Sequence, residues 1–327
     1  MKKLLIGLLI FVMFLAFVVN GFAQAEFVIK IASSANAEEP QSIAMDLFAK
    51  NVEEKSNGRI KCEHYPSNQL GSERDVLEGL QIGTIEMIAP ATSVMGNWVP
   101  ELNLFELPFI FKNRDHWWAV LDSEIGMSFA DACAEQGFHL LGFYDVGARH
   151  IMTTGKAINS IEDMKGLKIR TMENTAHLDA FKAFGANPTP MAYAELYTAL
   201  QTEVIDGAEA ANVNYNSKKF YEVAPNWAQV GWIHLAQIVV MSKIFYDKLP
   251  PDLQELVNNE AKVAIKFERE AYKEKDESLL PNLEALGVKV TYPDKQQFVE
   301  AASVVYDKWA DQVGGREKID AVLNFKY

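Results

Sequence analysis

Short strand-forming runs alternate with helical stretches at the start of the chain. The pattern predicts strand, helix, strand, helix and strand, in that order, over residues 27–31, 43–52, 60–64, 76–80 and 85–88. Glycines at Gly58 and Gly83 are expected to end the two helices. Strands separated by helices pair in parallel, because each crossover returns the chain to the same end of the sheet. The first part of the chain therefore predicts an α/β lobe.

A second run of the same kind begins after Gly147. It predicts extended segments over residues 149–154, 167–170 and 204–206. It predicts helices over residues 175–184 and 193–202. Gly207 is expected to end the strand at 204–206. A long charged helical stretch then covers about residues 252–280 and is expected to end at Pro281. We expect this helix to form a solvent-facing spine that crosses both lobes.

Composition and charge narrow the class of protein. The chain has 327 residues, of which 49% are hydrophobic and 23% are charged, as in a globular protein with a well-filled core. Single cores stop growing near about 250–300 residues, so we expect two lobes. The formal charge of -13 leaves no basic stripe to neutralise phosphates, so we expect no nucleic acid partner. Cys62 and Cys133 lack any nearby metal-binding spacing; we expect two buried thiols, with one disulfide as the alternative.

Residues 1–25 have the layout of a secretory signal peptide. Two lysines precede an apolar run over residues 4–19, and Ala23-Gln24-Ala25 supplies a small-residue cleavage site. We expect cleavage there and a periplasmic mature protein that starts near Glu26. A permanent membrane anchor is the alternative, because the apolar run is only slightly shorter than the roughly 20 residues that span a bilayer.

Motifs for catalysis are missing from the sequence. The glycine-rich phosphate and dinucleotide loops, the serine-hydrolase elbow and the zinc-protease helix motif are all absent, and the six histidines are scattered singly. We therefore expect no catalytic residue, no metal site and no cofactor.

Two arginines stand beside strands of the second lobe. Arg170 ends the strand at 167–170, and Arg149 begins the extended segment after Gly147. Ligands of open α/β sheets bind beyond the carboxyl ends of the strands, which is where Arg170 is expected to lie. A guanidinium grips a carboxylate through two parallel charge-assisted hydrogen bonds. From spacing alone, an ion pair within the protein explains these arginines equally well.

Longer motifs resemble a known family, and this resemblance favours ligand binding over an internal ion pair as the role of the two arginines. The sequence resembles the periplasmic solute-binding proteins of tripartite ATP-independent periplasmic (TRAP) transporters, the DctP family, at residues 65–71, 107–111, 166–170, 187–191, 195–201, 204–209 and 248–253. The resemblance covers essentially the whole mature chain. It implies a two-lobed periplasmic binding protein fold of the α/β class, with a ligand cleft between the lobes, a long hinge-spanning helix and no catalysis. Lobe I is expected at residues 26–147 plus 236–274, and lobe II at residues 148–235 plus 275–327.

The same resemblance implies roles for individual residues. Arg170 matches the arginine that forms a bidentate salt bridge with the ligand carboxylate, and Arg149 matches a second arginine that supports this group. Tyr193 matches an aromatic position beside the ligand, and Glu73 matches an acid that accepts hydrogen bonds from ligand hydroxyls. Gln237 matches a polar position near the cleft, and Ser34 lies at the exit of the first strand, where its side chain is expected to reach the ligand.

One departure from the family pattern affects the cleft. Many members have an asparagine where this chain has Ala210. We expect either Asn212 or Asn214 to replace it, with Asn212 assigned to the site, or else a ligand that is bulkier or more apolar there. Trp232 stands where sialic-acid-binding members often have polar residues, so sialic acid is not assumed to be the ligand.

Taken with the resemblance, these features predict an extracytoplasmic solute-binding protein. We expect it to capture a small organic monocarboxylate or dicarboxylate and to deliver it to the membrane permease subunits of a TRAP transporter. The alternatives are a sensory binding protein that presents its closed form to a receptor kinase and a periplasmic enzyme on the same fold. A monomer is expected, with a helix-swapped dimer as the exception.

Overall fold

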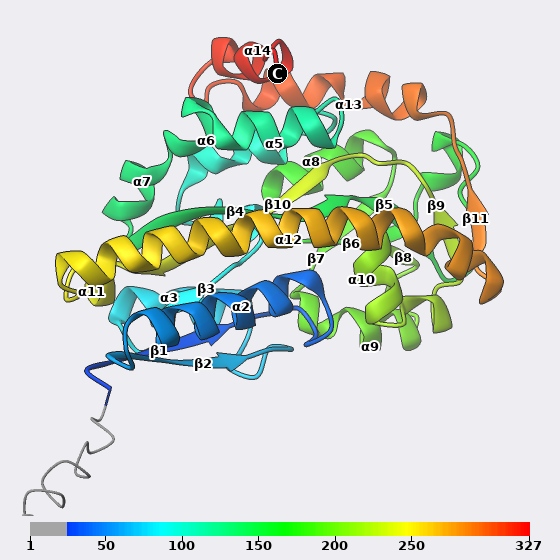
Figure 1. The fold of residues 1–327 in the computed structure, drawn as a ribbon. Coiled ribbons are helices and arrows are strands. Elements are labelled where there is room, and N and C mark those ends of the chain that lie inside the picture. The colour runs from blue at the N-terminus through cyan, green and yellow to red at the C-terminus, as the bar shows by residue number, and fades with distance from the viewer. Residues whose placement is uncertain (1–24) are drawn as a thin grey trace, which may run out of the picture.

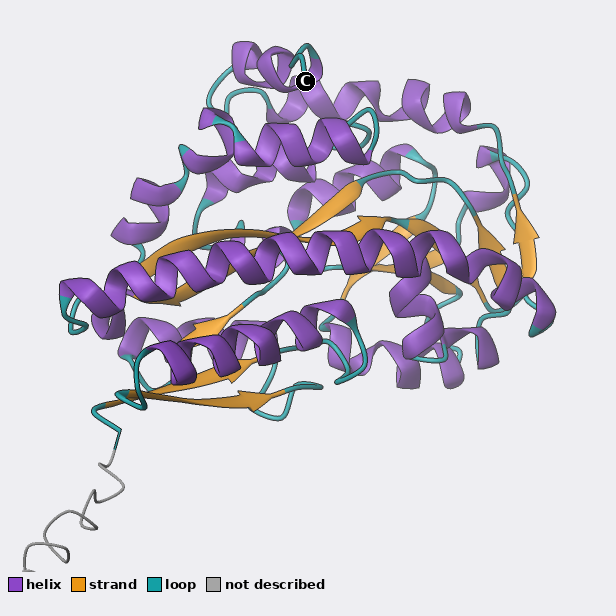
Figure 2. Ribbon diagram, in the orientation of Figure 1, coloured by secondary structure: helices purple, strands orange, loops and turns teal. Residues whose placement is uncertain are grey.

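The computed structural model describes residues 25–327 and contains two β-sheets, each with helices packed around it (Figure 1; Figure 2). This arrangement confirms the predicted α/β class and the two-lobed architecture. The predicted signal peptide lies outside the described residues, except for its last residue. Among residues 25–327, no helix is long and apolar enough to cross a membrane.

The first sheet has the strand order β2-β1-β3-β10-β4. β1 pairs in parallel with β2 and β3, as the alternating pattern predicted, and β10 lies antiparallel between β3 and β4. The bounds of these strands, in chain order, are Phe27–Ala32 (β1), Ile60–Tyr65 (β2), Met87–Ile88 (β3), Phe138–Ala148 (β4) and His234–Ser242 (β10).

The second sheet has the strand order β11-β9-β5-β8-β6-β7. β6 is parallel to β7 and β8, and β5 runs antiparallel to β8 and β9. The bounds are His150–Thr153 (β5), Lys168–Thr171 (β6), Asn187–Pro190 (β7), Gly207–Ala210 (β8), Asn226–Ala228 (β9) and Lys289–Thr291 (β11).

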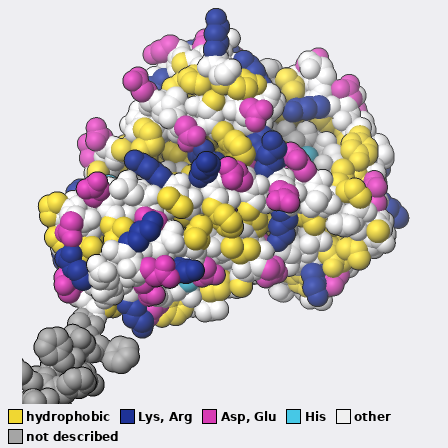
Figure 3. Space-filling model, in the orientation of Figure 1, with side chains coloured by type: hydrophobic (Ala, Val, Ile, Leu, Met, Phe, Trp, Pro, Cys, Tyr) yellow, Lys and Arg dark blue, Asp and Glu magenta, His cyan; other side chains and the backbone are white. Residues whose placement is uncertain are grey.

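Two chain crossings and one helix join the sheets. β4 ends in the first sheet at Ala148, and the chain enters the second sheet as β5 one residue later; it returns between β9 and β10. The 35-residue helix α12 (Pro251–Ala285) contacts β4 beside the first sheet and α10 (Asn212–Ser217) beside the second. Figure 1 shows α12 passing in front of both sheets, and Figure 3 shows charged and apolar side chains interspersed on this outer face. The predicted spine is therefore present.

The remaining helices surround the sheets. Helices of the α type are α2 (Pro40–Lys55), α3 (Glu73–Ile82), α4 (Thr92–Met95), α5 (Arg114–Asp122), α6 (Glu124–Met127), α7 (Ala130–Glu135), α8 (Thr175–Ala183), α9 (Leu196–Gln201), α11 (Lys243–Tyr246), α13 (Lys295–Trp309) and α14 (Arg316–Leu323). Short 3₁₀ helices are η1 (Pro100–Glu106), η2 (Ile161–Met164), η3 (Tyr193–Glu195) and η4 (Phe220–Glu222). α13 packs on α8, and the carbonyl oxygen of Val322 in α14 forms a hydrogen bond with Nε2 of His116 in α5.

The residue boundaries of the two lobes given above stay a prediction.

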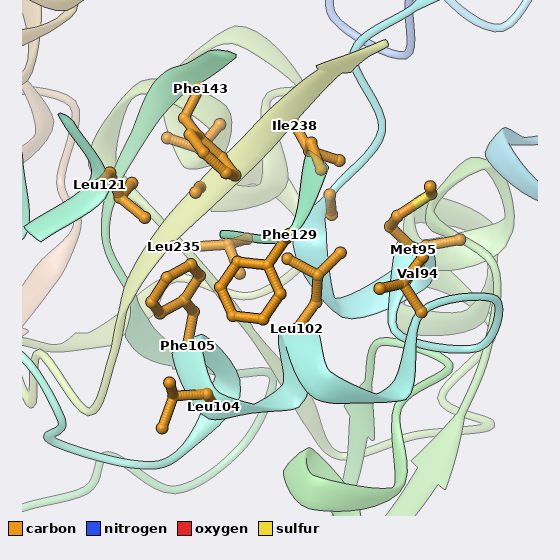
Figure 4. Packing of buried hydrophobic residues seen from close by; sticks show 14 of the residues in the cluster. Val94, Met95, Leu102, Leu104, Phe105, Leu121, Phe129, Phe143, Leu235 and Ile238 are labelled. Carbon is orange, nitrogen blue, oxygen red and sulfur yellow. The ribbon is translucent and has the colours of Figure 1, made fainter. Parts of the chain in front are cut away.

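A large apolar cluster packs under the crossing strands (Figure 4). Phe105 of η1 meets Phe129 and Phe143 edge-on, with ring centroids 5.1 and 6.2 Å apart. Leu235 and Ile238 of β10 belong to the same cluster. Burying each such side chain stabilises the fold by about 1.5–3 kcal/mol. This burial stabilises the crossing strands. Two free thiols are present, a buried Cys133 in this cluster and a half-buried Cys62.

The strand predicted at residues 204–206 is wrong, because the strand in this region covers Gly207–Ala210 (β8). Val204 is 58% exposed and lies in a bend, whereas β8 begins at Gly207, the residue expected to end the strand. A Cβ atom at 207 would overlap the carbonyl oxygen of Met152 on the neighbouring strand β5. The glycine therefore permits a close approach between strands rather than a stop.

The helix end predicted at Pro281 is also wrong, because α12 continues to Ala285. A proline inside a helix removes one backbone hydrogen bond and crowds the preceding turn. Here Leu279 and Leu283, on either side of Pro281, are both buried. Burial of these leucines against the protein offsets the lost bond, which a local sequence pattern does not reveal.

Gly207 offers a direct test of the close approach of β8 to β5. We expect Gly207→Ala to lower the free energy of unfolding by about 2–4 kcal/mol, because the new methyl group must displace backbone. The control is Gly155→Ala, since nothing lies within 4 Å of a Cβ atom at that position. Urea unfolding followed by circular dichroism measures both variants; equal midpoints would contradict the close approach.

Candidate ligand-binding site

A cavity lies between the two lobes, beside the crossing strands. It encloses about 690 Å³, including the part that opens to solvent. The first-lobe side supplies polar residues around β1 and α3, and the second-lobe side supplies others around β6, η3 and α10. Its polar lining comprises Ser34, Gln41, Asn68, Ser72, Glu73, Arg149, Arg170, Glu173, Tyr193, Asn214 and Gln237.

Arg149 is held where the chain passes from the first sheet to the second. Its Nε donates to Oε2 of Glu209 at 2.6 Å, and Nη1 donates to Oδ1 of Asn214 at 3.1 Å. Burial by itself raises the pKa of Glu209, but the attraction and hydrogen bond of Arg149 outweigh it, so this pKa lies below its usual range. Arg149 and Glu209 therefore form a buried ion pair in the wall of the cavity.

Arg170 has an unused donor in the same wall. Its Nε donates to the carbonyl oxygen of Met191 at 2.9 Å, but Nη1 is buried and has no hydrogen-bond partner among residues 25–327. Nη1 lies 3.5 Å from Oε1 of Glu209, whose carboxylate is already bonded to Arg149. Burial lowers the pKa of Arg170; the attraction of Glu209 offsets part of this, and repulsion from Arg149 adds to it. A buried guanidinium in this state favours an additional anion.

Tyr193 lies next to Arg170. The guanidinium of Arg170 is 5.9 Å from the centre of the Tyr193 ring, and the ammonium of Lys218 is 5.5 Å from it. The phenol oxygen of Tyr193 is buried without a hydrogen-bond partner within the described chain. Tyr193 therefore adds a second unused polar atom to the cavity wall on the side of Arg170.

Glu73 provides an acceptor on the opposite side of the cavity. Its carboxylate accepts hydrogen bonds from Ser34 Oγ at 2.7 Å and from the amide of Ala91 at 3.2 Å. Burial raises the pKa of Glu73, and these two hydrogen bonds oppose the rise. Gln41 and Gln237 add buried amide oxygens with no hydrogen-bond partner within residues 25–327. The cavity thus has a cationic side and a side rich in acceptors.

Six of the seven predicted ligand-binding residues line this one cavity, namely Ser34, Glu73, Arg149, Arg170, Tyr193 and Gln237. Their contact with a ligand stays a prediction. Asn212 is not in the lining, because its amide oxygen accepts hydrogen bonds from Trp227 at 2.9 Å and from Gln229 at 3.2 Å. Asn214, the other candidate to replace the asparagine absent at Ala210, lines the cavity instead.

Trp232 is also absent from the cavity lining. It is fully buried, and its ring packs edge-on against His177 and Phe181 at 4.8 and 5.1 Å. Trp232 therefore has no bearing on whether the cavity accepts sialic acid.

Sequence reasoning missed several lining residues on the first-lobe side. Gln41 lies in the first turn of α2, and Asn68 and Ser72 lie in the turn before α3. Common surface turns have the same polar composition, so no local signal marks them as cleft residues. Within residues 25–327, no group of three or more His, Cys, Asp or Glu side chains is arranged to hold a metal ion.

Comparison with known proteins gives the family. The model of the bacterial extracellular solute-binding proteins, family 7 (DctP), matches residues 31–312. A solute-binding protein of Verminephrobacter eiseniae is 35% identical over 89% of this chain and 87% of its own length. Two crystal structures of TRAP periplasmic solute-binding proteins superpose closely on this fold. That of Sulfurospirillum deleyianum, with bound succinate, is 33% identical, has a TM-score of 0.88 and covers 92% of this chain and 100% of its own.

The second structure extends the range of bound ligands among these proteins. It comes from a Bradyrhizobium species in complex with D-galacturonate, is 33% identical with a TM-score of 0.88, and covers 91% of this chain and 99% of its own. The match to the family model spans most of the chain, and the relatives are matched over nearly their whole length. The chain belongs to the bacterial extracellular solute-binding proteins of family 7, a family of transport proteins rather than enzymes.

Proposed function

We propose that this protein captures a small hydroxylated carboxylic acid in the periplasm, closes over it, and delivers it to the membrane permease of a TRAP transporter. The observation that carries the proposal is that the buried Arg170 lines the cavity while its Nη1, 3.5 Å from Oε1 of Glu209, has no hydrogen-bond partner in the described chain. A ligand carboxylate supplies the missing acceptor and the missing negative charge.

The charges around the cavity support a single carboxylate at the Arg170 side. Glu209 is the acid that pairs with both arginines, and it is already bonded to Arg149 at 2.6 Å. On this side of the cavity, Arg149, Arg170 and Glu209 together carry one net positive formal charge, while Glu73 and Glu173 lie elsewhere in the lining. A ligand carboxylate at Arg170 neutralises this positive charge, and its hydrogen bonds strengthen as closure excludes water.

The Glu73 side supports hydroxyl groups over a second carboxylate. A ligand hydroxyl donates a hydrogen bond to Glu73, whereas a second carboxylate there would face another acceptor and be repelled when both are ionised. Among the similar proteins, one binds succinate and another binds galacturonate. The position of Glu73 favours a sugar acid of the second kind for this chain.

Export and transport complete the proposal. The predicted signal sequence at residues 1–25 supports secretion and cleavage. Similar proteins are described as periplasmic and as parts of TRAP transporters. Membership of the same family supports delivery to a permease for this chain.

Arg170 is the first residue to test. We expect D-galacturonate, D-glucuronate, D-galactonate or succinate to raise the melting temperature of the wild-type protein, and Arg170→Ala to abolish this rise. The expected loss is about 3–5 kcal/mol of binding free energy, because the carboxylate would be buried without its partner. Thermal-shift measurements compare it with Arg316→Ala, which removes a largely exposed arginine paired with Asp307 at 2.9 Å. Undiminished stabilisation of the Arg170→Ala protein would contradict the assignment.

Glu73 tests the chemical class of the ligand. We expect Glu73→Gln to weaken binding of D-galacturonate by about tenfold, as for loss of a hydrogen bond to a charged group. Binding of succinate should be unchanged or stronger, because a repulsive charge is removed. Glu78→Gln, on an exposed position of the same helix, is the control. Isothermal titration calorimetry measures both acids; an equal change in both Kd values would argue against hydroxyl recognition by Glu73.

A further inference from the structure

The loop between β1 and α2 touches α10 beside the cavity. This loop, residues 33–39, follows a strand of the first sheet, and α10 follows β8 of the second sheet. Asn36 Nδ2 donates to the carbonyl oxygen of Ser217 at 3.2 Å, and Lys218 Nζ donates to the carbonyl oxygen of Ser34 at 3.1 Å. These bonds join groups from opposite lobes, so they exist only when the lobes are together.

Glu39 is the centre of this contact. It is completely buried, and among residues 25–327 it forms no ion pair within 4.0 Å. Its carboxylate accepts hydrogen bonds from Asn214 Nδ2, Ser217 Oγ and the amide of Asn36, each at 2.9 Å. Two of these three donors belong to the opposite lobe. A buried carboxylate depends on such donors, because an unpaired charge in the interior is costly.

Asn214 connects this contact to the candidate ligand site. Its Nδ2 donates to Glu39, while its Oδ1 accepts from Nη1 of Arg149 at 3.1 Å. One amide side chain therefore bridges the cavity wall and the opposing lobe. Any shift of Arg149 toward or away from a ligand alters the position of Asn214, and with it the bond to Glu39.

We propose that Glu39, through Asn214 and Ser217, is a latch that holds the two lobes closed and links closure to the occupancy of the site at Arg149. The proposal rests on the ligand-capture function above and adds a positioning residue outside the cavity lining. When the lobes separate, Glu39 loses both donors from α10 and gains water in their place. The latch therefore stabilises the closed form and slows ligand release, with little effect on the first encounter with the ligand.

The test compares Glu39→Gln with Glu38→Gln, which removes the same charge from an exposed neighbouring residue. Stopped-flow tryptophan fluorescence measures the dissociation rate of D-galacturonate, or of succinate if only succinate binds. We expect Glu39→Gln to raise this rate about tenfold, the size of effect for hydrogen bonds to a charged group, and Glu38→Gln to leave it unchanged. Ser217→Ala should give a smaller rise, and the double variant should be non-additive because both changes act on one contact.

A second readout separates a latch from a general packing role. Relative to Glu38→Gln, Glu39→Gln should lower the melting temperature more with ligand than without it, because ligand increases the population of the closed form. A general loss of packing would lower the melting temperature equally in both states. Equal dissociation rates in the two variants, or a melting temperature lowered equally in both states, would overturn the latch.

The design also keeps the latch distinct from the proposed function. If none of the four acids binds the wild-type protein, the proposed ligand class fails. Small-angle X-ray scattering of the ligand-free proteins then decides the latch alone. A larger radius of gyration for Glu39→Gln than for Glu38→Gln supports it, and identical scattering overturns it.

Discussion

Three buried charged groups, Arg149, Glu209 and Arg170, form the ion-pair cluster in the cavity wall on which the proposed ligand site depends. Glu209 lies 2.6 Å from the Nε of Arg149 and 3.5 Å from the Nη1 of Arg170, so one carboxylate serves two guanidiniums unequally. The Glu209 carboxylate forms its hydrogen bonds with Arg149, and Nη1 of Arg170 is left without a hydrogen-bond partner among the described residues. Because a buried charge without a partner is costly, this asymmetry supports the proposed binding of one anion at Arg170.

The fold places these groups where a change in lobe position affects them directly. Arg149 lies between β4 and β5, at the point where the chain leaves one sheet for the other. Arg170 belongs to β6 of the second sheet, while Ser34 and Glu73 come from elements beside the first sheet. A ligand held between Arg170 and Glu73 therefore contacts both lobes, and its binding energy favours the arrangement that brings them together.

Closure also has contacts that involve no ligand. The hydrogen bonds of Glu39 to α10 and of Lys218 to the loop after β1 join the lobes beside the cavity. Such contacts lower the free energy of the closed form, and the affinity for a ligand rises with the population of that form. If the proposed site is correct, residues outside the cavity lining should contribute to ligand affinity as well as the arginines.

Sequence patterns were enough to predict the α/β class, the parallel start of the first sheet and the long helix, and the resemblance to a known family predicted six residues of the cavity lining. These features follow from local periodicity or from short motifs. Tertiary structure alone decided that α12 continues past Pro281, that Gly207 opens β8, and that Asn214 rather than Asn212 faces the cavity. It also decided that Glu39 meets α10, 175 residues away from it at Asn214. Each of these outcomes depends on contacts between segments that are distant in the sequence. A local sequence pattern does not predict which buried groups come into contact.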